Sequence, residues 1–193
     1  MTTYTYKVLD HLPFIPEHLI AQAYKTLDDN RDNQNLSVSS SVFANRFVVK
    51  DGITYPSTYI RRFPLNEEFQ SWIRKNIVTE WNECSIARTL GDRSPFQGPH
   101  TDLVRCYVLM YILENGGDNC TTAWYQEKGK DFYRPGKLLL TVDDYDLLDE
   151  RDRVQLPTGS WAIINTEYLH AVENIEKDRI AVHLGLDTDK FVK

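Results

Sequence analysis

The sequence is poor in cysteine, and its few cysteines do not form a recognisable framework. Its 193 residues include only three cysteines, Cys84, Cys106 and Cys120, and no two of them form a C-x-x-C pair. An odd number of cysteines without metal-type spacing argues against a disulfide-stapled secreted domain and against a zinc site. We therefore expect reduced thiols, as in a cytosolic protein.

The chain also lacks an excess of basic residues and long apolar runs. Lys and Arg total 22 against 28 Asp and Glu, a formal net charge of −6. Proteins that coat nucleic acid carry a basic stripe, so a nucleic-acid partner is not expected. No apolar run is long enough to span a membrane, and the N-terminus lacks the features of a signal peptide. These absences predict a cytoplasmic protein without a membrane partner and leave its oligomeric state open.

Motifs of several enzyme classes are missing as well. The pair Gly116-Gly117 is typical of a turn rather than a phosphate-binding loop, and no Ser/His/Asp or Cys/His spacing indicates acyl transfer. Aromatic residues, in contrast, are abundant: 11 Tyr, 8 Phe and 4 Trp. Such a composition suits a β-rich fold with an aromatic-lined pocket.

The first part of the chain carries two helix signals. Pro16 is well placed to begin a helix over 17–27, and Asn66 is well placed to cap a second helix over 67–78. Apolar side chains recur on one face of the second helix. We expect both helices to pack against one sheet of a β-structure that follows.

From about residue 84 the apolar pattern becomes that of β-strands. Short strands separated by Gly, Pro and Asn turns are typical of a jelly roll or a similar antiparallel barrel. The acidic segment 143–152 is expected to be a surface loop or a short helical turn. The expected strands lie at 43–49, 104–113, 120–125, 137–142, 153–156, 160–165, 169–174 and 179–187.

Chain length and element order together predict one α+β domain, 1–193. Residues 1–83 would form a helical and extended buttress, and residues 84–187 a jelly-roll core. Loops select the substrate in many barrels. The candidate loops here are polar with several aromatics and lie at 28–42, 51–64 and 126–136.

The most informative motif is His100-Thr101-Asp102, followed at a distance by His170. Residues two apart on an extended strand point to the same side, so His100 and Asp102 could bind one metal ion while Thr101 points away. His170 from a distant strand would complete two imidazoles and one carboxylate, the ligand set of non-haem Fe(II) oxygenases. The alternative makes His100 a loop histidine and Asp102 a turn or cap residue.

Arg179 opens an apolar run nine residues after His170. If residues 175–178 form a hairpin loop, Asn174 lies opposite Arg179 and His170 lies opposite His183. Arg179, Ala181 and His183 would then share a face near the metal. An arginine there could bind a carboxylate of a short dicarboxylate through its planar fork. The alternative is an exposed strand residue paired with an acidic side chain of the loop.

Arg105 and His183 each allow more than one interpretation. Arg105 is expected to begin a strand face with Tyr107, Leu109 and Tyr111, where an arginine needs a carboxylate partner or solvent. It is a second candidate for binding the cosubstrate or substrate, against a structural salt bridge. His183 could be an alternative metal ligand, a pocket residue or a core histidine.

These residues resemble the pattern of the Fe(II)/2-oxoglutarate-dependent dioxygenases: His-x-Asp, a distal His, and an Arg about ten residues further on. The corresponding residues are His100, Asp102, His170 and Arg179, and the resemblance covers roughly 95–187. Within that superfamily the chain looks most similar to the aspartyl/asparaginyl β-hydroxylase and free-proline hydroxylase branch. The resemblance implies a double-stranded β-helix (jelly-roll) barrel buttressed by the N-terminal helices.

It also implies a catalytic metal site at His100, Asp102 and His170, with Fe(II), O2 and the cosubstrate 2-oxoglutarate as cofactors. Arg179 would bind the far carboxylate of 2-oxoglutarate, and Arg105 is the second candidate cofactor-binding residue. The implied reaction is hydroxylation of a C–H bond of a small polar or amino-acid-like substrate, a small molecule or a peptide, with release of succinate and CO2. The alternatives are a cupin-type metal enzyme that does not use 2-oxoglutarate and a non-catalytic jelly-roll binding module.

Overall fold

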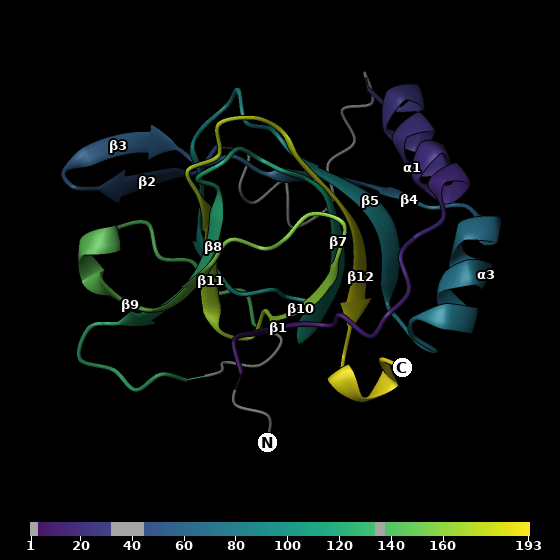
Figure 1. The fold of residues 1–193 in the computed structure, drawn as a ribbon. Coiled ribbons are helices and arrows are strands. Elements are labelled where there is room, and N and C mark those ends of the chain that lie inside the picture. The colour runs from purple at the N-terminus through teal and green to yellow at the C-terminus, as the bar shows by residue number, and fades with distance from the viewer. Residues whose placement is uncertain (1–3, 32–44, 134–137) are drawn as a thin grey trace.

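Two antiparallel sheets face each other in the computed structural model, which describes residues 4–31, 45–133 and 138–193 (Figure 1). The six-stranded sheet has the order β1-β10-β7-β12-β5-β4, the four-stranded sheet the order β6-β11-β8-β9, and β2 and β3 form a separate hairpin. The strands are β1 (Tyr6–Val8), β2 (Phe47–Lys50), β3 (Ile53–Pro56), β4 (Ile60–Pro64), β5 (Glu83–Thr89), β6 (Phe96–His100), β7 (Tyr107–Asn115), β8 (Thr121–Glu127), β9 (Leu148–Val154), β10 (Trp161–Asn165), β11 (Leu169–Glu173) and β12 (Arg179–Leu186).

The helices α1 (Glu17–Asp29) and α3 (Glu67–Asn76) cover the outer face of the six-stranded sheet (Figure 1). The Asn66 side chain accepts a hydrogen bond from the Phe69 backbone N–H at 2.9 Å, which satisfies one free donor of the first helical turn. Both predicted helices and their position against one sheet are therefore confirmed. None of the helices in the described ranges is long and apolar enough to cross a membrane.

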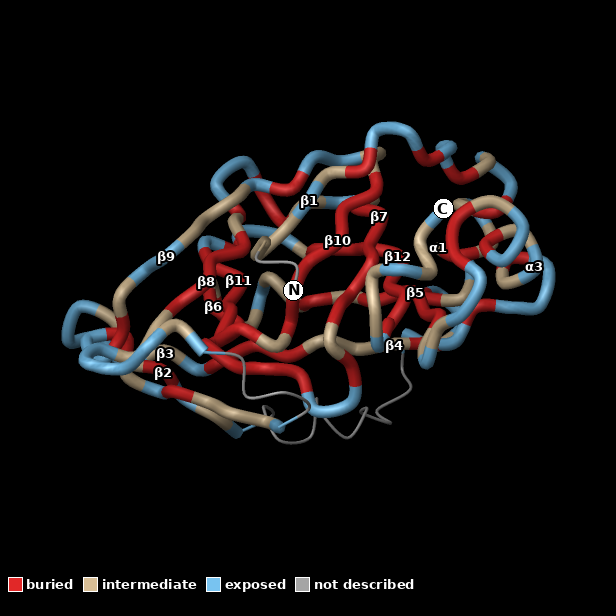
Figure 2. Tube along the Cα trace, turned by 90° about the horizontal axis from the view of Figure 1, so that it is seen from below, coloured by how far each residue is buried: buried red, intermediate tan, exposed pale blue. Residues whose placement is uncertain are grey.

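The middle of the molecule lies between the sheets, where Figure 2 shows the buried strands. All eight residues of β12 are buried, and their side chains alternate between the helix side and the space between the sheets. Ala181 packs in the inner cluster with Met110 and Trp124, whereas Val182 and Leu184 pack towards the helices. This alternation directs Arg179 and His183, with Ala181, towards the space between the sheets.

The predicted hairpin of 169–174 with 179–187 is wrong. Strand β11 pairs with β6 and β8 in one sheet, and β12 pairs with β5 and β7 in the other. The connection crosses between the sheets, and Asn174 has the positive φ of 57° that a sharp turn requires. His170 and His183 therefore face each other across the molecule rather than along one sheet. Hairpin and crossover connections have similar lengths, so the sequence does not separate them.

Other boundaries differ too. Residues 138–142 form only an isolated bridge from Thr141 to His100, not a strand, and residue 137 lies outside the described residues. The predicted acidic loop 143–152 holds a short 3-10 helix η1 (Tyr145–Leu147) and most of β9, and the C-terminus holds η2 (Asp189–Phe191). The predicted loop 51–64 contains β3 and β4. Parts of the other two candidate substrate loops, 32–42 and 134–136, lie outside the described residues.

Candidate functional site

A cavity lies between the two sheets, and its empty space, counted together with the solvent at its mouth, is about 520 Å³. The four-stranded sheet contributes His100 and His170, and the six-stranded sheet contributes Arg179 and His183. The cavity therefore brings together side chains that come from distant parts of the chain and from both sheets.

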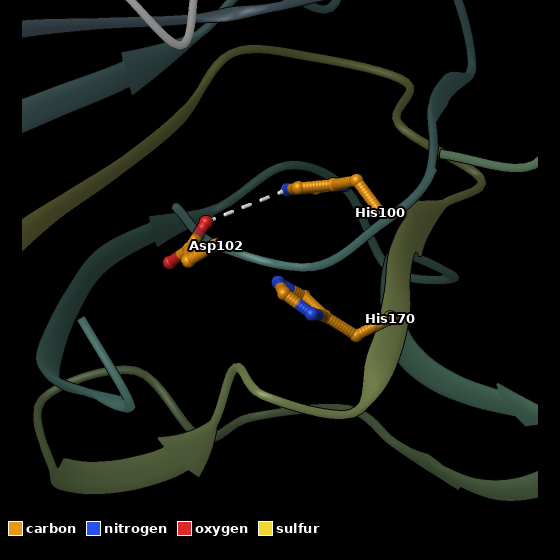
Figure 3. Close-up of side chains that lie close together, drawn as sticks. All are labelled: His100, Asp102 and His170. Atoms are coloured by element: carbon orange, nitrogen blue, oxygen red, sulfur yellow. Dashed lines mark ion pairs between the residues drawn. The ribbon is translucent and has the colours of Figure 1, made fainter. Parts of the chain in front are cut away.

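His100, Asp102 and His170 converge on one point at the wall of this cavity (Figure 3). Their nearest ligand atoms all lie within 4.8 Å of one another, and His100 Nε2 lies 3.9 Å from Asp102 Oδ1. All three residues are buried, with exposed fractions of 4%, 7% and 5%. His100 ends β6 and pairs in register with His170 of β11, whereas Asp102 lies just beyond the strand. Among the described residues this is the one such cluster of potential metal ligands.

Backbone carbonyls orient both imidazoles. His100 Nδ1 lies 2.8 Å from the Gly98 carbonyl oxygen, and His170 Nδ1 lies 2.9 Å from the Tyr168 carbonyl oxygen. A ring nitrogen that donates to a carbonyl fixes the tautomer, so the lone pair of each ring lies on Nε2. Both Nε2 atoms are thus available to one ion. Thr101 points away, as expected, and its hydroxyl donates to the Leu138 carbonyl.

Arg105 holds the carboxylate of Asp102. Its Nε donates to Asp102 Oδ2 at 2.6 Å, and its Nη1 donates to Glu83 Oε2 at 2.6 Å. Asp102 Oδ1 is left on the side of the histidines. The predicted strand face of Arg105 is wrong: Tyr107, Leu109 and Tyr111 pack towards the helices, while the Arg105 side chain lines the cavity. Arg105 lies before β7 begins, so the alternation of that strand does not govern it.

The electrostatics of the cluster keep it in the form that binds a cation. Burial is the main cause that lowers the pKa of His100, to about 3, and it also lowers the pKa of His170. Burial by itself would raise the pKa of Asp102, but Arg105 and the two histidines outweigh it and hold that pKa well below its usual range. Two neutral imidazoles and one carboxylate are the donor set that a divalent metal requires. The residues present therefore fit Fe(II).

Arg179 lies buried in the same cavity with neutral neighbours. It donates to the Thr122 hydroxyl at 3.2 Å and contacts Met110 Sδ at 3.9 Å and the Cys120 thiol. Within the described ranges, no carboxylate hydrogen-bonds or ion-pairs with it, and its exposed fraction is 8%. Burial lowers its pKa. A guanidinium in such surroundings is costly unless an anion joins it, so this wall is suited to binding a carboxylate.

His183 lies in the cavity but outside the metal cluster. Burial first, and then Arg62, Arg105 and Arg179, hold its pKa well below the usual range. Its Nδ1 has no hydrogen-bond partner among the described residues. Of the three interpretations of His183, the pocket residue is the one that its position favours.

The cavity lining also includes residues that were not singled out from the sequence, among them Arg62 on β4, Gln97 on β6 and Thr122 on β8. Gln97 lies three residues before His100, and Thr122 lies in a predicted strand, so alternation could have placed Thr122 on the inner face. Arg62 carried no such signal, because β4 was expected to be a loop.

Comparison with known proteins identifies the architecture. No family model and no curated protein sequence matches the chain. Among solved structures, a prolyl hydroxylase from Trichoplax adhaerens, in complex with a hypoxia-inducible-factor peptide fragment, is similar with a TM-score of 0.51 at 13% identity. The alignment covers 96% of this chain and 84% of that one.

A second similar structure is SnoK, a non-haem α-ketoglutarate-dependent carbocyclase from nogalamycin biosynthesis. It aligns with a TM-score of 0.53 at 10% identity and covers 94% of this chain and 79% of that chain. At these identities the likeness concerns the fold. The chain has an α+β double-stranded β-helix (jelly-roll) fold with helices on one sheet, as the sequence predicted.

Proposed function

We propose that this protein is an Fe(II)- and 2-oxoglutarate-dependent oxygenase that hydroxylates a C–H bond of a small polar or amino-acid-like substrate and releases succinate and CO2. One observation carries the proposal: a buried His–Asp–His cluster and a buried arginine without a carboxylate partner among the described residues line the same cavity. The fold is that of the prolyl hydroxylase and of the α-ketoglutarate-dependent carbocyclase compared above, which supports the use of 2-oxoglutarate.

The proposed roles follow from the positions of the side chains. His100 and His170 would bind the metal through Nε2 and Asp102 through Oδ1, on one side of the ion. Arg179, assisted by the Thr122 hydroxyl, would bind the far carboxylate of 2-oxoglutarate. When bound, Fe(II) supplies the activation of O2 and the oxidative decarboxylation of 2-oxoglutarate that drive hydroxylation.

Apolar side chains form part of the cavity wall. Val108, Met110, Ile164 and Val172 line it beside the polar residues. Apolar surroundings strengthen the interaction of Arg179 with a carboxylate.

The primary substrate could be a small molecule or a peptide. The similar prolyl hydroxylase was solved with a peptide fragment, which supports a peptide, whereas the burial of the cluster favours a small molecule. A cytoplasmic location stays a prediction from the sequence.

The test is production of succinate from 2-oxoglutarate with Fe(II) and O2, together with the binding of each component. We expect wild type to form succinate and His170→Ala to bind no Fe(II) while remaining folded. His18→Ala, on the exposed side of α1, is the matched control. Iron binding without binding of 2-oxoglutarate would favour a cupin-type metal enzyme, and binding of neither would favour a non-catalytic jelly-roll module.

A further inference from the structure

His183 is a buried polar side chain that the protein leaves partly unsatisfied. It lies on β12, lines the cavity and is 8% exposed. Its Nδ1 has no hydrogen-bond partner among the described residues. A buried polar atom without a partner is destabilising, and few such atoms occur in native proteins. The ring is therefore suited to a partner that comes from outside the chain.

The inner face of β12 places His183 between Arg179 and the side chains that hold Asp102. Arg179 and His183 point into the cavity from this strand, and Gly185 continues the same alternation. A Cβ at Gly185 would lie 3.1 Å from Cδ of Arg105, the residue that binds Asp102. Along the strand, the Cα atoms of Arg179 and His183 are about 13 Å apart. His183 is therefore the inward side chain of β12 that lies towards the metal cluster.

The two histidines of the metal cluster lie on the other wall of the cavity. His100 and His170 belong to the four-stranded sheet, whereas His183 belongs to the six-stranded sheet. Protein ligands that bind an ion from one side leave its other side open to further ligands. His183 thus lies on the wall that such further ligands would face.

The surroundings keep the His183 ring neutral. Burial, and then three neighbouring arginines, hold its pKa well below the usual range. A neutral imidazole carries one N–H and one lone pair, so it can bind an oxygen without adding a buried charge. A carboxylate oxygen beside Nδ1 would favour the tautomer that has its proton on this nitrogen.

We infer that His183 positions 2-oxoglutarate at the metal, with Nδ1–H donating to the carboxylate next to the keto group. Arg179 and His183 would then hold the two carboxylates of the cosubstrate from one strand. This inference rests on the proposed function and adds a binding residue to the same site. A role of His183 in binding the primary substrate alone is the alternative that the experiment separates.

The test measures cosubstrate binding without any primary substrate. Full-length protein is loaded anaerobically with Fe(II), and 2-oxoglutarate is titrated while the visible charge-transfer band is followed. His183→Leu should raise the Kd for 2-oxoglutarate by about tenfold, the effect of losing a hydrogen bond to a charged group. It should also shift the band, because the lost hydrogen bond ends on the carboxylate that chelates the metal with the keto group. Affinity for Fe(II) alone should not change.

A double variant shows which carboxylate His183 binds. Contacts to opposite ends of one ligand act independently, so the effects of His183→Leu and Arg179→Gln on the Kd should multiply. If both side chains bound the far carboxylate, the effect of His183→Leu would disappear in the Arg179→Gln background.

Conservative variants separate this contact from a structural role. The side-chain amide of Asn can place an N–H near the position of Nδ1, so His183→Asn should bring the Kd back to within about threefold of wild type. His183→Gln places its amide further out and should resemble His183→Leu. His18→Leu, on the exposed side of α1, is the matched control. His183→Leu removes an unpartnered polar atom and should fold with undiminished stability to urea; if it does not fold, His183→Gln tests the same contact.

Three results would overturn the inference. They are an unchanged Kd and band in folded His183→Leu, no recovery in His183→Asn, and an effect of His183→Leu that disappears in the Arg179→Gln background. The first of these would limit His183 to the primary substrate or to a structural role. Absence of the band in wild-type protein is a different result, because it contradicts the proposed function itself.

Discussion

The buried charge of Arg179 affects both the stability of the protein and its affinity for a carboxylate. It lies between Thr122, Met110 and Cys120, none of which carries a negative charge. In the protein without ligands the guanidinium has lost water and gained no anion, which is destabilising. Binding of a carboxylate would recover that free energy.

Arg179→Gln should therefore weaken the binding of 2-oxoglutarate and stabilise the ligand-free protein against unfolding. Hydrogen bonds to charged groups contribute about 1.5–3 kcal/mol, so we expect the Kd for 2-oxoglutarate to rise by roughly ten- to a hundredfold. Affinity for Fe(II) should not change. Calorimetric titration with Arg151→Gln on the exposed part of β9 as control measures both. An unchanged Kd for 2-oxoglutarate would remove Arg179 from the proposed site.

Arg105 acts through Asp102. Arg105→Gln leaves Asp102 without its main cationic partner and Glu83 with Arg62 alone. Removing one partner of a buried ion pair costs about 3–5 kcal/mol, and because Glu83 is partly exposed we expect the lower end, measured by urea unfolding. Mn(II) should restore part of the loss by neutralising Asp102. Unchanged stability with a weaker affinity for 2-oxoglutarate would instead make Arg105 a cosubstrate-binding residue.

Strand β11 presents different chemistry on its two faces. His170 and Val172 face the cavity, while Leu169, Ala171 and Glu173 face outward beneath the β2–β3 hairpin. Glu173 is fully buried and binds Lys50 of β2 at 2.7 Å, Arg153 of β9 at 3.0 Å and the Tyr125 hydroxyl of β8. This carboxylate joins β2 of the hairpin to the four-stranded sheet that carries His170, and it links β11 to β8 and β9 within that sheet.

Glu173→Gln should loosen that attachment in a pH-dependent way. Burial would raise the pKa of Glu173, but Lys50, Tyr125 and Arg153 outweigh it and hold the pKa below its usual value. A lowered folded pKa gives stability that is complete above the unfolded pKa, about 4.3, and that is lost as pH falls through the folded value. We expect wild type to exceed the variant by about 2 kcal/mol at neutral pH, since Lys50 and Arg153 are partly exposed.

Urea unfolding at pH 7 and pH 3.5 measures this difference, which should shrink in acid. A difference of equal size at both pH values would mean that the charge of Glu173 contributes nothing.

At the level of elements, capping residues predict where the helices begin, and periodicity predicts which face of a strand is buried. Pro16 and Asn66 located both helices, and the alternation from Arg179 to His183 located the inner face of β12. The partner of each strand was not predictable, because a tight turn and a crossover between sheets need similar numbers of residues. Strands β1, β3, β4, β5 and β6 lie outside the predicted strand ranges. Strand β4 is short and carries Arg61 and Arg62, and β6 holds Gly98 and Pro99, so neither has a clear strand pattern.

At the scale of the whole molecule, the cavity with its candidate metal ligands forms because the two sheets face each other. The predicted ligands were found from spacing and resemblance, and their convergence within 4.8 Å accords with that prediction, while their metal-binding role stays a prediction. The register between sheets, which brings Arg62 into the cavity, depends on long-range packing that local patterns do not encode. The division into 1–83 and 84–187 also stays a prediction, and β1 and β4 from the first part add strands to the six-stranded sheet.

The most direct measurement is an anaerobic titration of the metal-free protein with Fe(II) and then 2-oxoglutarate. A visible charge-transfer band needs a metal held by one sheet and a keto acid chelated to it in the shared cavity. We predict a band that appears only with both components, at one equivalent of each per chain, and that is absent in His100→Ala. A folded wild-type protein that binds Fe(II) and gives no band with 2-oxoglutarate would contradict the proposed function.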